Sequence, residues 1–213
     1  MIEVKSFTFN AFQENTYVVV DQESKQCLIF DPGCSNESEV ARLIAFLDEK
    51  NLTPMKLINT HCHIDHVLGN KAISEKYDLI LEAHKDEVPI LESCAMVSKM
   101  YGIQYDTSPS INNFLDEGEL IRLNSLSLST ILVPGHSPGS LCFYSASEKF
   151  LIGGDVLFYG SIGRTDLPGG NHGDLIRNIK SKLFGLPDDV VVYPGHGPNT
   201  TIGFEKSNNP FLS

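Results

Sequence analysis

Three histidines within one seven-residue segment restrict the fold of this chain more than any other sequence feature. The segment is Thr60-His61-Cys62-His63-Ile64-Asp65-His66, and it directly follows an apolar run at Met55–Asn59 that we predict to be a strand. Two imidazoles at positions i and i+2 of an extended segment leave it on the same side, as two ligands of one ion must. Asp65 and His66 lie where the chain begins to turn, so they can point toward a second ion. The pattern predicts a buried strand that ends in a metal-binding loop.

Three further segments share one design, in which a predicted strand runs into a glycine-containing turn that carries a ligand-type side chain. They are Val133-Pro134-Gly135-His136, Gly153-Gly154-Asp155 and Tyr193-Pro194-Gly195-His196. Taken alone, each of these side chains is more often structural than metal-bound, and the histidine cluster alone is compatible with a chance surface cluster. Loops at strand ends can converge on a common cleft, however. Together the four segments supply five imidazoles and two carboxylates, which suffice for two ions and water.

The order of predicted strands and helices favours a layered α/β domain with mixed sheets, although it does not define the topology. Strands are predicted at Glu3–Phe9, Tyr17–Asp21, Cys27–Phe30, Met55–Asn59, Glu119–Arg122, Leu126–Val133, Leu141–Tyr144, Phe150–Ile152 and Val190–Tyr193. Helices are predicted at Glu37–Lys50, Val67–Lys76, Lys85–Met100 and Asp174–Leu183. No linker separates two parts of the chain, so residues 1–213 are expected to form one domain.

Net charge and cysteine usage limit the partners and the compartment. With 16 basic and 27 acidic residues the formal net charge is −11, which repels phosphate backbones and argues against a nucleic-acid partner. No secretory signal is visible, and no stretch reaches the roughly 18 apolar residues that span a bilayer. The five cysteines are scattered without C-x-x-C spacing, as is typical of reduced thiols. We therefore expect a cytoplasmic protein without a membrane partner.

The four ligand-bearing segments, in this order, resemble the metallo-β-lactamase-fold hydrolases over most of the chain. The resemblance implies a four-layer αββα sandwich with two facing mixed sheets and the metals in a cleft along one edge. It also implies the ligands of both ions. By analogy, the first ion would be held by His61, His63 and His136, the second by Asp65, His66 and His196, with Asp155 bridging the two.

Within that superfamily the chain is similar to the short bacterial members of the glyoxalase II-type (hydroxyacylglutathione hydrolase-like) branch. The similarity is carried by the stretch from Gly163 to Gly170, by Pro194-Gly195-His196-Gly197-Pro198, and by the ending from Glu205 to Leu212. Arg164 matches a cationic position that contacts glutathione in that family. The family's tyrosines two residues after this arginine and two after the last histidine are Asp166 and Pro198 here. The chain also ends soon after His196, where full-length glyoxalase II enzymes carry a helical region. Glutathione recognition is therefore expected to be weakened.

The resemblance implies a dinuclear hydrolase that cleaves a thioester such as S-lactoylglutathione, or an ester, by attack of a metal-bound hydroxide. Asp65 and Asp155 would orient the hydroxide or accept its proton, and Arg164 would meet a substrate carboxylate unless it forms an ordinary surface ion pair. Zinc is the first choice for the two divalent ions, with iron or manganese as alternatives. The expected partner is a small-molecule substrate.

Three alternatives remain open at this stage. The same superfamily contains a mononuclear iron persulfide dioxygenase, which would use His61, His136 and Asp155. A two-metal phosphodiesterase and a non-enzymatic metal-binding protein are the others. Outside the ligand set, we expect Cys62 to be buried packing, because period-2 alternation points it away from its neighbours, and we expect His84 and His172 to be structural.

Overall fold

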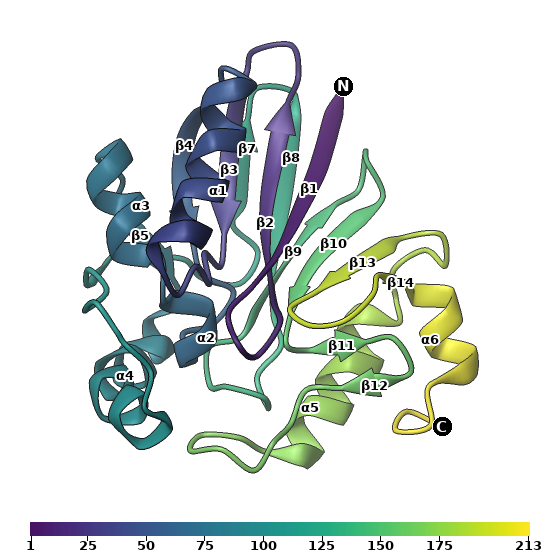
Figure 1. The fold of residues 1–213 in the computed structure, drawn as a ribbon. Coiled ribbons are helices and arrows are strands. Elements are labelled where there is room, and N and C mark those ends of the chain that lie inside the picture. The colour runs from purple at the N-terminus through teal and green to yellow at the C-terminus, as the bar shows by residue number, and fades with distance from the viewer.

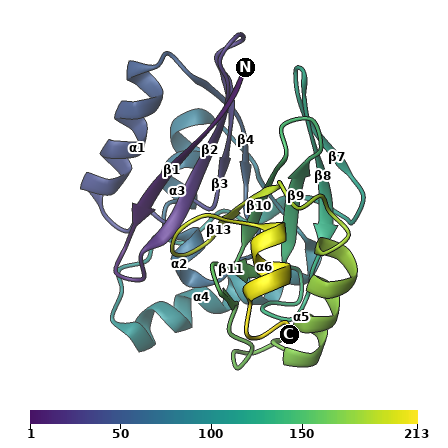
Figure 2. The same ribbon diagram turned by 90° about the vertical axis from the view of Figure 1, so that its right-hand side faces the viewer.

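Two six-stranded β-sheets pack face to face, with helices on both outer faces, in the computed structural model, which describes residues 1–213 (Figure 1). The view in Figure 2 separates the layers, with α1 (Glu37–Glu49) outside one sheet and α5 (His172–Asn178) outside the other. This arrangement confirms the predicted α/β class and the four-layer αββα sandwich.

The first sheet has the strand order β1-β2-β3-β4-β5-β6. Its first three strands pair antiparallel, and β3 to β6 pair parallel, so the sheet is mixed. Its strands are β1 (Ile2–Phe9), β2 (Glu14–Asp21), β3 (Gln26–Phe30), β4 (Thr53–Ile58), β5 (Leu81–Ala83) and β6 (Ile111–Phe114).

The second sheet has the order β14-β13-β10-β9-β8-β7, in which only β10 and β13 pair parallel. Its strands are β7 (Leu120–Leu123), β8 (Leu126–Leu132), β9 (Leu141–Ser145), β10 (Phe150–Gly154), β13 (Val191–Pro194) and β14 (Thr200–Thr201). A separate hairpin is formed by β11 (Leu157–Phe158) and β12 (Ser161–Ile162).

The helices cover the outer faces and supply parts of the loops at the strand ends. Besides α1 and α5 they are α2 (Ile64–Val67), α3 (Asn70–Tyr77), the 3-10 turn η1 (Lys85–Glu87), α4 (Val88–Tyr101), the π-helical segment η2 (Ile179–Leu183) and α6 (Ile202–Asn208). None of these helices has both the length and the apolar character that crossing a lipid bilayer requires.

Side-chain alternation in the buried strands divides the apolar residues among three cores. In β2, Tyr17 and Val19 join the core between the sheets, whereas Val18 and Val20 face the core under α1 and α3. Because successive strand residues point to opposite faces, a strand buried on both sides must be apolar throughout. This is why continuous apolar runs, rather than alternating ones, mark the central strands.

Several short elements differ from the prediction. The predicted helix Val67–Lys76 coincides with α3 and with only the last residue of α2, because the chain breaks at Gly69, whose N–H donates to the carbonyl oxygen of Pro32 at 2.7 Å. The predicted helix Lys85–Met100 opens as the 3-10 turn η1, because Pro89 in the first turn of α4 has no backbone N–H to donate. The strands β5, β6, β11, β12 and β14 and the helix α6 were not predicted. Each spans too few residues for periodicity to reveal it.

Phe143 joins the two sheets at the centre of the sandwich. Its ring meets that of Phe30 edge-on with centroids 5.0 Å apart, and both side chains are fully buried. We expect Phe143→Ala to lower the free energy of unfolding by about 3–5 kcal/mol, because the lost ring leaves a cavity between the sheets. Urea unfolding of the metal-free protein measures this loss. The half-exposed Ile80 is the control, and Ile80→Ala should change stability by less than about 0.5 kcal/mol. Equal effects of the two substitutions would contradict this packing.

Candidate metal centre

All seven predicted ligand residues lie together at one end of the sandwich. The loop after β4 and the helix α2 carry four of them, and the loops after β8, β10 and β13 carry one each. The seven are His61, His63, Asp65, His66, His136, Asp155 and His196. The strand ends therefore converge as the repeated strand–turn design predicts. How each of these side chains acts is a proposal, taken up below.

Three imidazoles form the first donor group. The Nε2 atom of His136 lies 3.1 Å from Nε2 of His61 and 2.8 Å from Nδ1 of His63. Ring nitrogens from the loop after β4 and the loop after β8 that face one another this closely could hold one cation.

Asp65, His66 and His196 form the second donor group. The Nε2 atom of His196 lies 3.1 Å from a carboxylate oxygen of Asp65, which is itself 3.7 Å from Nε2 of His66. Asp155 lies between the two groups. One of its oxygens is 3.4 Å from Nε2 of His66, and the other is 3.5 Å from Nε2 of both His136 and His196. A carboxylate in this place can contact a cation in either group.

Two buried polar atoms of this centre test whether the residues fit a cation. Nε2 of His66 and Oδ1 of Asp155 are inaccessible to solvent and have no hydrogen-bond partner. Buried polar atoms that lack a hydrogen-bond partner cost free energy, about 1–3 kcal/mol each, unless something else satisfies them. Both atoms point into the centre, so the donor set fits divalent cations.

Hydrogen bonds on the outer side orient four of the five imidazoles. Nδ1 of His136 donates to the carbonyl oxygen of Arg164 at 2.7 Å, and Nδ1 of His196 donates to that of Phe12 at 3.1 Å. Nδ1 of His66 lies 3.1 Å from a carboxylate oxygen of Asp31. A ring nitrogen that donates outward leaves the other nitrogen with its lone pair directed inward. These bonds select the tautomer that can bind a metal through Nε2.

His61 is oriented through a hydroxyl group. Its Nδ1 atom lies 3.1 Å from Oγ1 of Thr60, whose own proton is donated to Asp31 at 2.6 Å. The hydroxyl oxygen is therefore an acceptor for the imidazole N–H, and Nε2 of His61 faces the first group unprotonated.

The two donor groups differ in charge. Burial, followed by repulsion from neighbouring imidazoles, lowers the pKa of His61 far below its ordinary value and that of His63 to about 3. Burial alone would also lower the pKa of His66, but the carboxylates of Asp155 and Asp65 outweigh it and raise this pKa well above the ordinary value. Burial opposes ionisation of Asp155 too, yet His66 holds its pKa below the usual range. The three imidazoles of the first group are neutral at pH 7. In the second group, a protonated His66 lies beside ionised carboxylates.

The sequence model of the Metallo-beta-lactamase superfamily matches residues 9–196, a range that includes all seven residues. The chain belongs to this superfamily. The probable metallo-hydrolase YqgX of Bacillus subtilis is 38% identical over 203 residues, which are 94% of this chain and 93% of the relative. Hydroxyacylglutathione hydrolase GloC of Haemophilus influenzae is 35% identical over 219 residues, covering 100% and 99% of the two chains.

Solved structures agree with this assignment. The crystal structure of BLEG-1 B3 metallo-beta-lactamase superposes with a TM-score of 0.91 at 36% identity, covering 99% of this chain and 100% of the other. The crystal structure of TTHA1623 in a di-iron-bound form gives a TM-score of 0.86 at 36% identity, covering 98% and 100%. Superfamily membership and these relatives support a metal-dependent hydrolase with divalent-metal ligands in the histidine and aspartate groups.

Asp31 contacts the candidate ligands, although the sequence indicated only that it is part of a turn. Its carboxylate accepts hydrogen bonds from the backbone N–H of Thr60 at 2.7 Å, from the Thr60 hydroxyl and from His66. It is buried behind the ligands, so it positions both His66 and, through Thr60, His61. The sequence signal was an aspartate directly after the buried strand β3, the same placement that marked Asp155.

Glu87 is a second positioning residue that the sequence did not reveal. It is fully buried, and its carboxylate accepts from the backbone N–H groups of Cys62 and Gly139 and from the Ser137 hydroxyl, each at 2.7 Å. Burial raises the pKa of Glu87, and these three bonds oppose that rise. One side chain thus joins the loop that carries His61 and His63 to the loop that carries His136.

The position of the loop that carries His136 also depends on Gly135, which packs closely against α5. Gly135 has φ 139°, and a Cβ there would lie 2.4 Å from the backbone nitrogen of Leu175 in α5. Asn171 is the N-cap of α5, and its N–H donates to the carbonyl oxygen of Gly135 at 2.7 Å. A side chain at this position would push α5 away and move His136.

The other predicted residues lie as follows. Cys62 is fully buried in the core under α1 and α3, and His84 is buried with its ring nitrogen accepting from the N–H of Asp86. His172 is the exposed first residue of α5. Arg164 lies at the rim, where its guanidinium is paired with Asp166.

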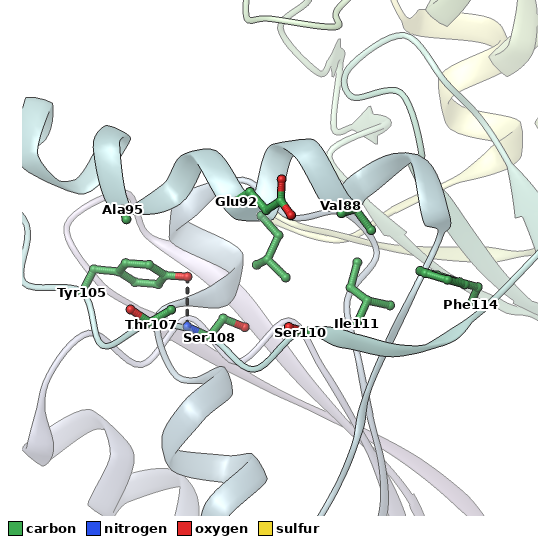
Figure 3. Close-up of a pocket in the computed structure, with 10 residues that line it drawn as sticks. Val88, Glu92, Ala95, Tyr105, Thr107, Ser108, Ser110, Ile111 and Phe114 are labelled. Atoms are coloured by element: carbon green, nitrogen blue, oxygen red, sulfur yellow. Dashed lines mark hydrogen bonds between the residues drawn. The ribbon is translucent and has the colours of Figure 1, made fainter.

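A pocket of about 290 Å³ lies apart from this centre, between α4 and the segment Tyr105–Phe114 (Figure 3). Val88 of α4 faces Ile111 across it, and the hydroxyl of Tyr105 accepts from the N–H of Ser108. None of the seven residues lines it.

We expect Glu87→Gln to weaken zinc binding by the first group about 10- to 100-fold, because the amide NH₂ must face a backbone N–H that needs an acceptor. Competition with a chromophoric chelator measures the dissociation constant. Glu205 is the matched control, since it is equally buried but bonds Gly160, Thr200 and Asn209 instead. Glu205→Gln should lower stability and leave this constant within about twofold. An equal loss of zinc affinity in both variants would contradict the role of Glu87.

The charge difference between the groups predicts proton release when cations bind. The carboxylates of Asp155 and Asp65 raise the pKa of His66 well above its ordinary value, so this ring is protonated at pH 7 before a cation binds, whereas burial lowers the pKa values of His61, His63 and His136 and keeps these rings neutral. Zinc titration of chelator-treated protein should therefore release roughly one proton per pair of ions. Calorimetry at pH 7 in buffers of different ionisation enthalpy counts them. Zinc binding without proton release would show that the second group is neutral.

Proposed function

We propose that this protein is a dinuclear metal-dependent hydrolase that cleaves thioesters such as S-lactoylglutathione. The observation that carries the proposal is the pair of donor groups, each with three ligand atoms within 4.8 Å of one another, that meet at Asp155. His61, His63 and His136 would hold one ion, and Asp65, His66 and His196 the other, with Asp155 between them.

Two divalent cations held there would supply a water of lowered pKa as nucleophile and positive charge to stabilise the developing oxyanion. The chain's own contribution begins with the ionised carboxylates. His66 and the hydrogen bond from His196 outweigh burial and hold the pKa of Asp65 below its usual range. Asp65 and Asp155 are therefore charged at neutral pH, where they can orient the attacking water and accept its proton.

No side-chain nucleophile competes with water at this centre. Cys62 lies between two of the ligands in sequence, but burial, followed by the charge of Glu87, raises the pKa of its thiol well above the ordinary value. The fully buried thiol is unavailable as a thiolate. This supports hydrolysis by water rather than a covalent acyl-enzyme route.

The thioester as substrate is supported by the relative named hydroxyacylglutathione hydrolase, which matches along the whole chain. The alternative of a mononuclear iron persulfide dioxygenase would need only His61, His136 and Asp155. All three members of the second group are present, and hydrogen bonds orient two of them, His66 and His196, which favours two ions. A two-metal phosphodiesterase is disfavoured by the net charge of −11, which repels phosphodiesters.

Hydrolysis of S-D-lactoylglutathione by protein of verified metal content tests the proposal. We expect turnover by the wild type and its loss, by at least about 10³-fold, in His63→Ala together with a lower metal content, because one ligand of the first group is gone. The exposed His172 lies outside the centre, so His172→Ala should retain both activity and metal. Full metal occupancy with no hydrolysis of any thioester would contradict the proposed reaction. Retained activity in His63→Ala would contradict the ligand assignment.

A further inference from the structure

We infer that Asn10, in the turn between β1 and β2, is a positioning residue for the second donor group, because its one amide supports both Asp65 and His196. Asn10 belongs to neither donor group and holds no cation itself. The inference rests on the proposed function, because it concerns the second of the two ions that this function requires.

Two members of the second group depend on support from outside the core. His66 is fully buried and bonds the buried Asp31. The side chains of Asp65 and His196 reach the surface, where 14% and 25% of them are exposed. They come from α2 and from the loop after β13, so the chain itself does not hold them together. The turn Asn10–Gln13, at the lower end of β1 and β2 in Figure 1, contacts both.

The amide of Asn10 fixes the main chain at Asp65. Its Nδ2 atom donates to the carbonyl oxygens of Asp65 and Gly33, each at 2.9 Å. The helix α2 has only four residues, so its carbonyl oxygens lack intrahelical partners. The N–H of Gly69, four residues after Asp65, donates to Pro32 instead. Asn10 therefore supplies the hydrogen bond that the short helix does not.

The same side chain orients the residue that bonds His196. Oδ1 of Asn10 accepts from the N–H of Phe12 at 2.9 Å, which closes the turn locally. The carbonyl oxygen of Phe12 accepts from Nδ1 of His196 at 3.1 Å. That bond leaves Nε2 of His196 facing Asp65, 3.1 Å from its carboxylate. One amide thus acts on Asp65 directly and on His196 through Phe12.

Asparagine meets the two requirements of this position. Asn10 has φ 50°, in the left-handed region that asparagine and glycine tolerate. An amide also offers donors and an acceptor together, whereas glycine offers neither and a carboxylate cannot donate. The contact is closely packed, since a Cβ on Gly33 would lie 2.5 Å from the carbonyl oxygen of Asp65 and 2.8 Å from Nδ2 of Asn10. The backbone N–H of Asn10 donates to Glu39 of α1 at 3.0 Å, which anchors the turn.

Replacing Asn10 by glycine tests the role of the amide, because glycine adopts this φ without strain and removes only the side chain. We expect Asn10→Gly to weaken zinc binding by the second donor group about 10- to 100-fold and to leave the first group within about twofold. Competition with chromophoric chelators measures both dissociation constants. NMR of bound cadmium assigns the loss to a group, because three imidazoles and a set with a carboxylate give separate resonances.

Asn124 provides the matched control. It lies in the turn between β7 and β8 with φ 52°, so its backbone conformation is the same. Its amide donates to side chains at the opposite end of β2 from the ligand loops, namely those of Asp21, Ser24 and Gln26. Asn124→Gly removes the same group from the same kind of turn. Both zinc affinities should stay within about twofold of the wild type in this variant.

The outcomes separate the inference from the proposed function. If the wild type holds only one ion, the dinuclear proposal fails and the inference falls with it. If the wild type holds two ions and hydrolyses no thioester, the proposed reaction is wrong and the role of Asn10 stands.

Three results would overturn the inference while leaving the proposed function intact. Unchanged affinity of the second group in Asn10→Gly would show that the amide does not position it. An equal loss at both groups, as an unfolded variant would give, would assign Asn10 a general structural role. An equal loss in Asn124→Gly would show that any such turn has the same effect.

Discussion

The buried carboxylate of Asp31 holds the metal-binding segment to the end of the first sheet, and the geometry of both donor groups depends on it. It accepts from the backbone N–H and the hydroxyl of Thr60 and from His66. Without it, a backbone N–H and an imidazole N–H would be left buried and unpaired, at a cost of about 1–3 kcal/mol each. The same three bonds choose the ring nitrogens that face inward, so one carboxylate couples the stability of the loop to the chemistry of the centre.

Hydrogen bonds between distant parts of the chain also hold the remaining loops. The carboxylate of Glu87 accepts from the backbone N–H groups of Cys62 and Gly139. Asn15 of β2 donates to the carbonyl oxygens of Pro194 and Gly197, on either side of His196. The candidate ligands therefore belong to a network of buried polar contacts. This network holds two donor groups that differ in charge. The neutral imidazole group and the carboxylate-rich group offer unlike environments to two otherwise similar cations.

The sequence pointed to the seven side chains that the structure brings together, and it missed the residues that orient them, for a physical reason. A candidate metal ligand is recognised by its residue type and its place at a strand end, as His136 and Asp155 are. A positioning residue is recognised only by its short distance to the ligand loops in the folded structure. In the sequence, Asp31 looks like part of a turn, and Glu87 looks like an ordinary acidic residue in the first turn of a helix. The α/β class followed from the order of apolar strand runs, such as that of β2, and helical periods, whereas the four-layer sandwich followed from the family resemblance. The two-residue strands β11, β12 and β14 and the break between α2 and α3 depend on contacts with distant loops, which no local pattern encodes.

The proposed reaction requires two cations, held on either side of the Asp155 carboxylate. Anomalous X-ray scattering from crystals of the purified protein, recorded at the absorption edges of zinc, iron and manganese, locates and identifies them in one experiment. We predict two peaks, one among His61, His63 and His136 and the other among Asp65, His66 and His196, with the Asp155 carboxylate between them. A single iron peak at His61, His136 and Asp155, with the second group unoccupied, would contradict the dinuclear centre and favour the dioxygenase.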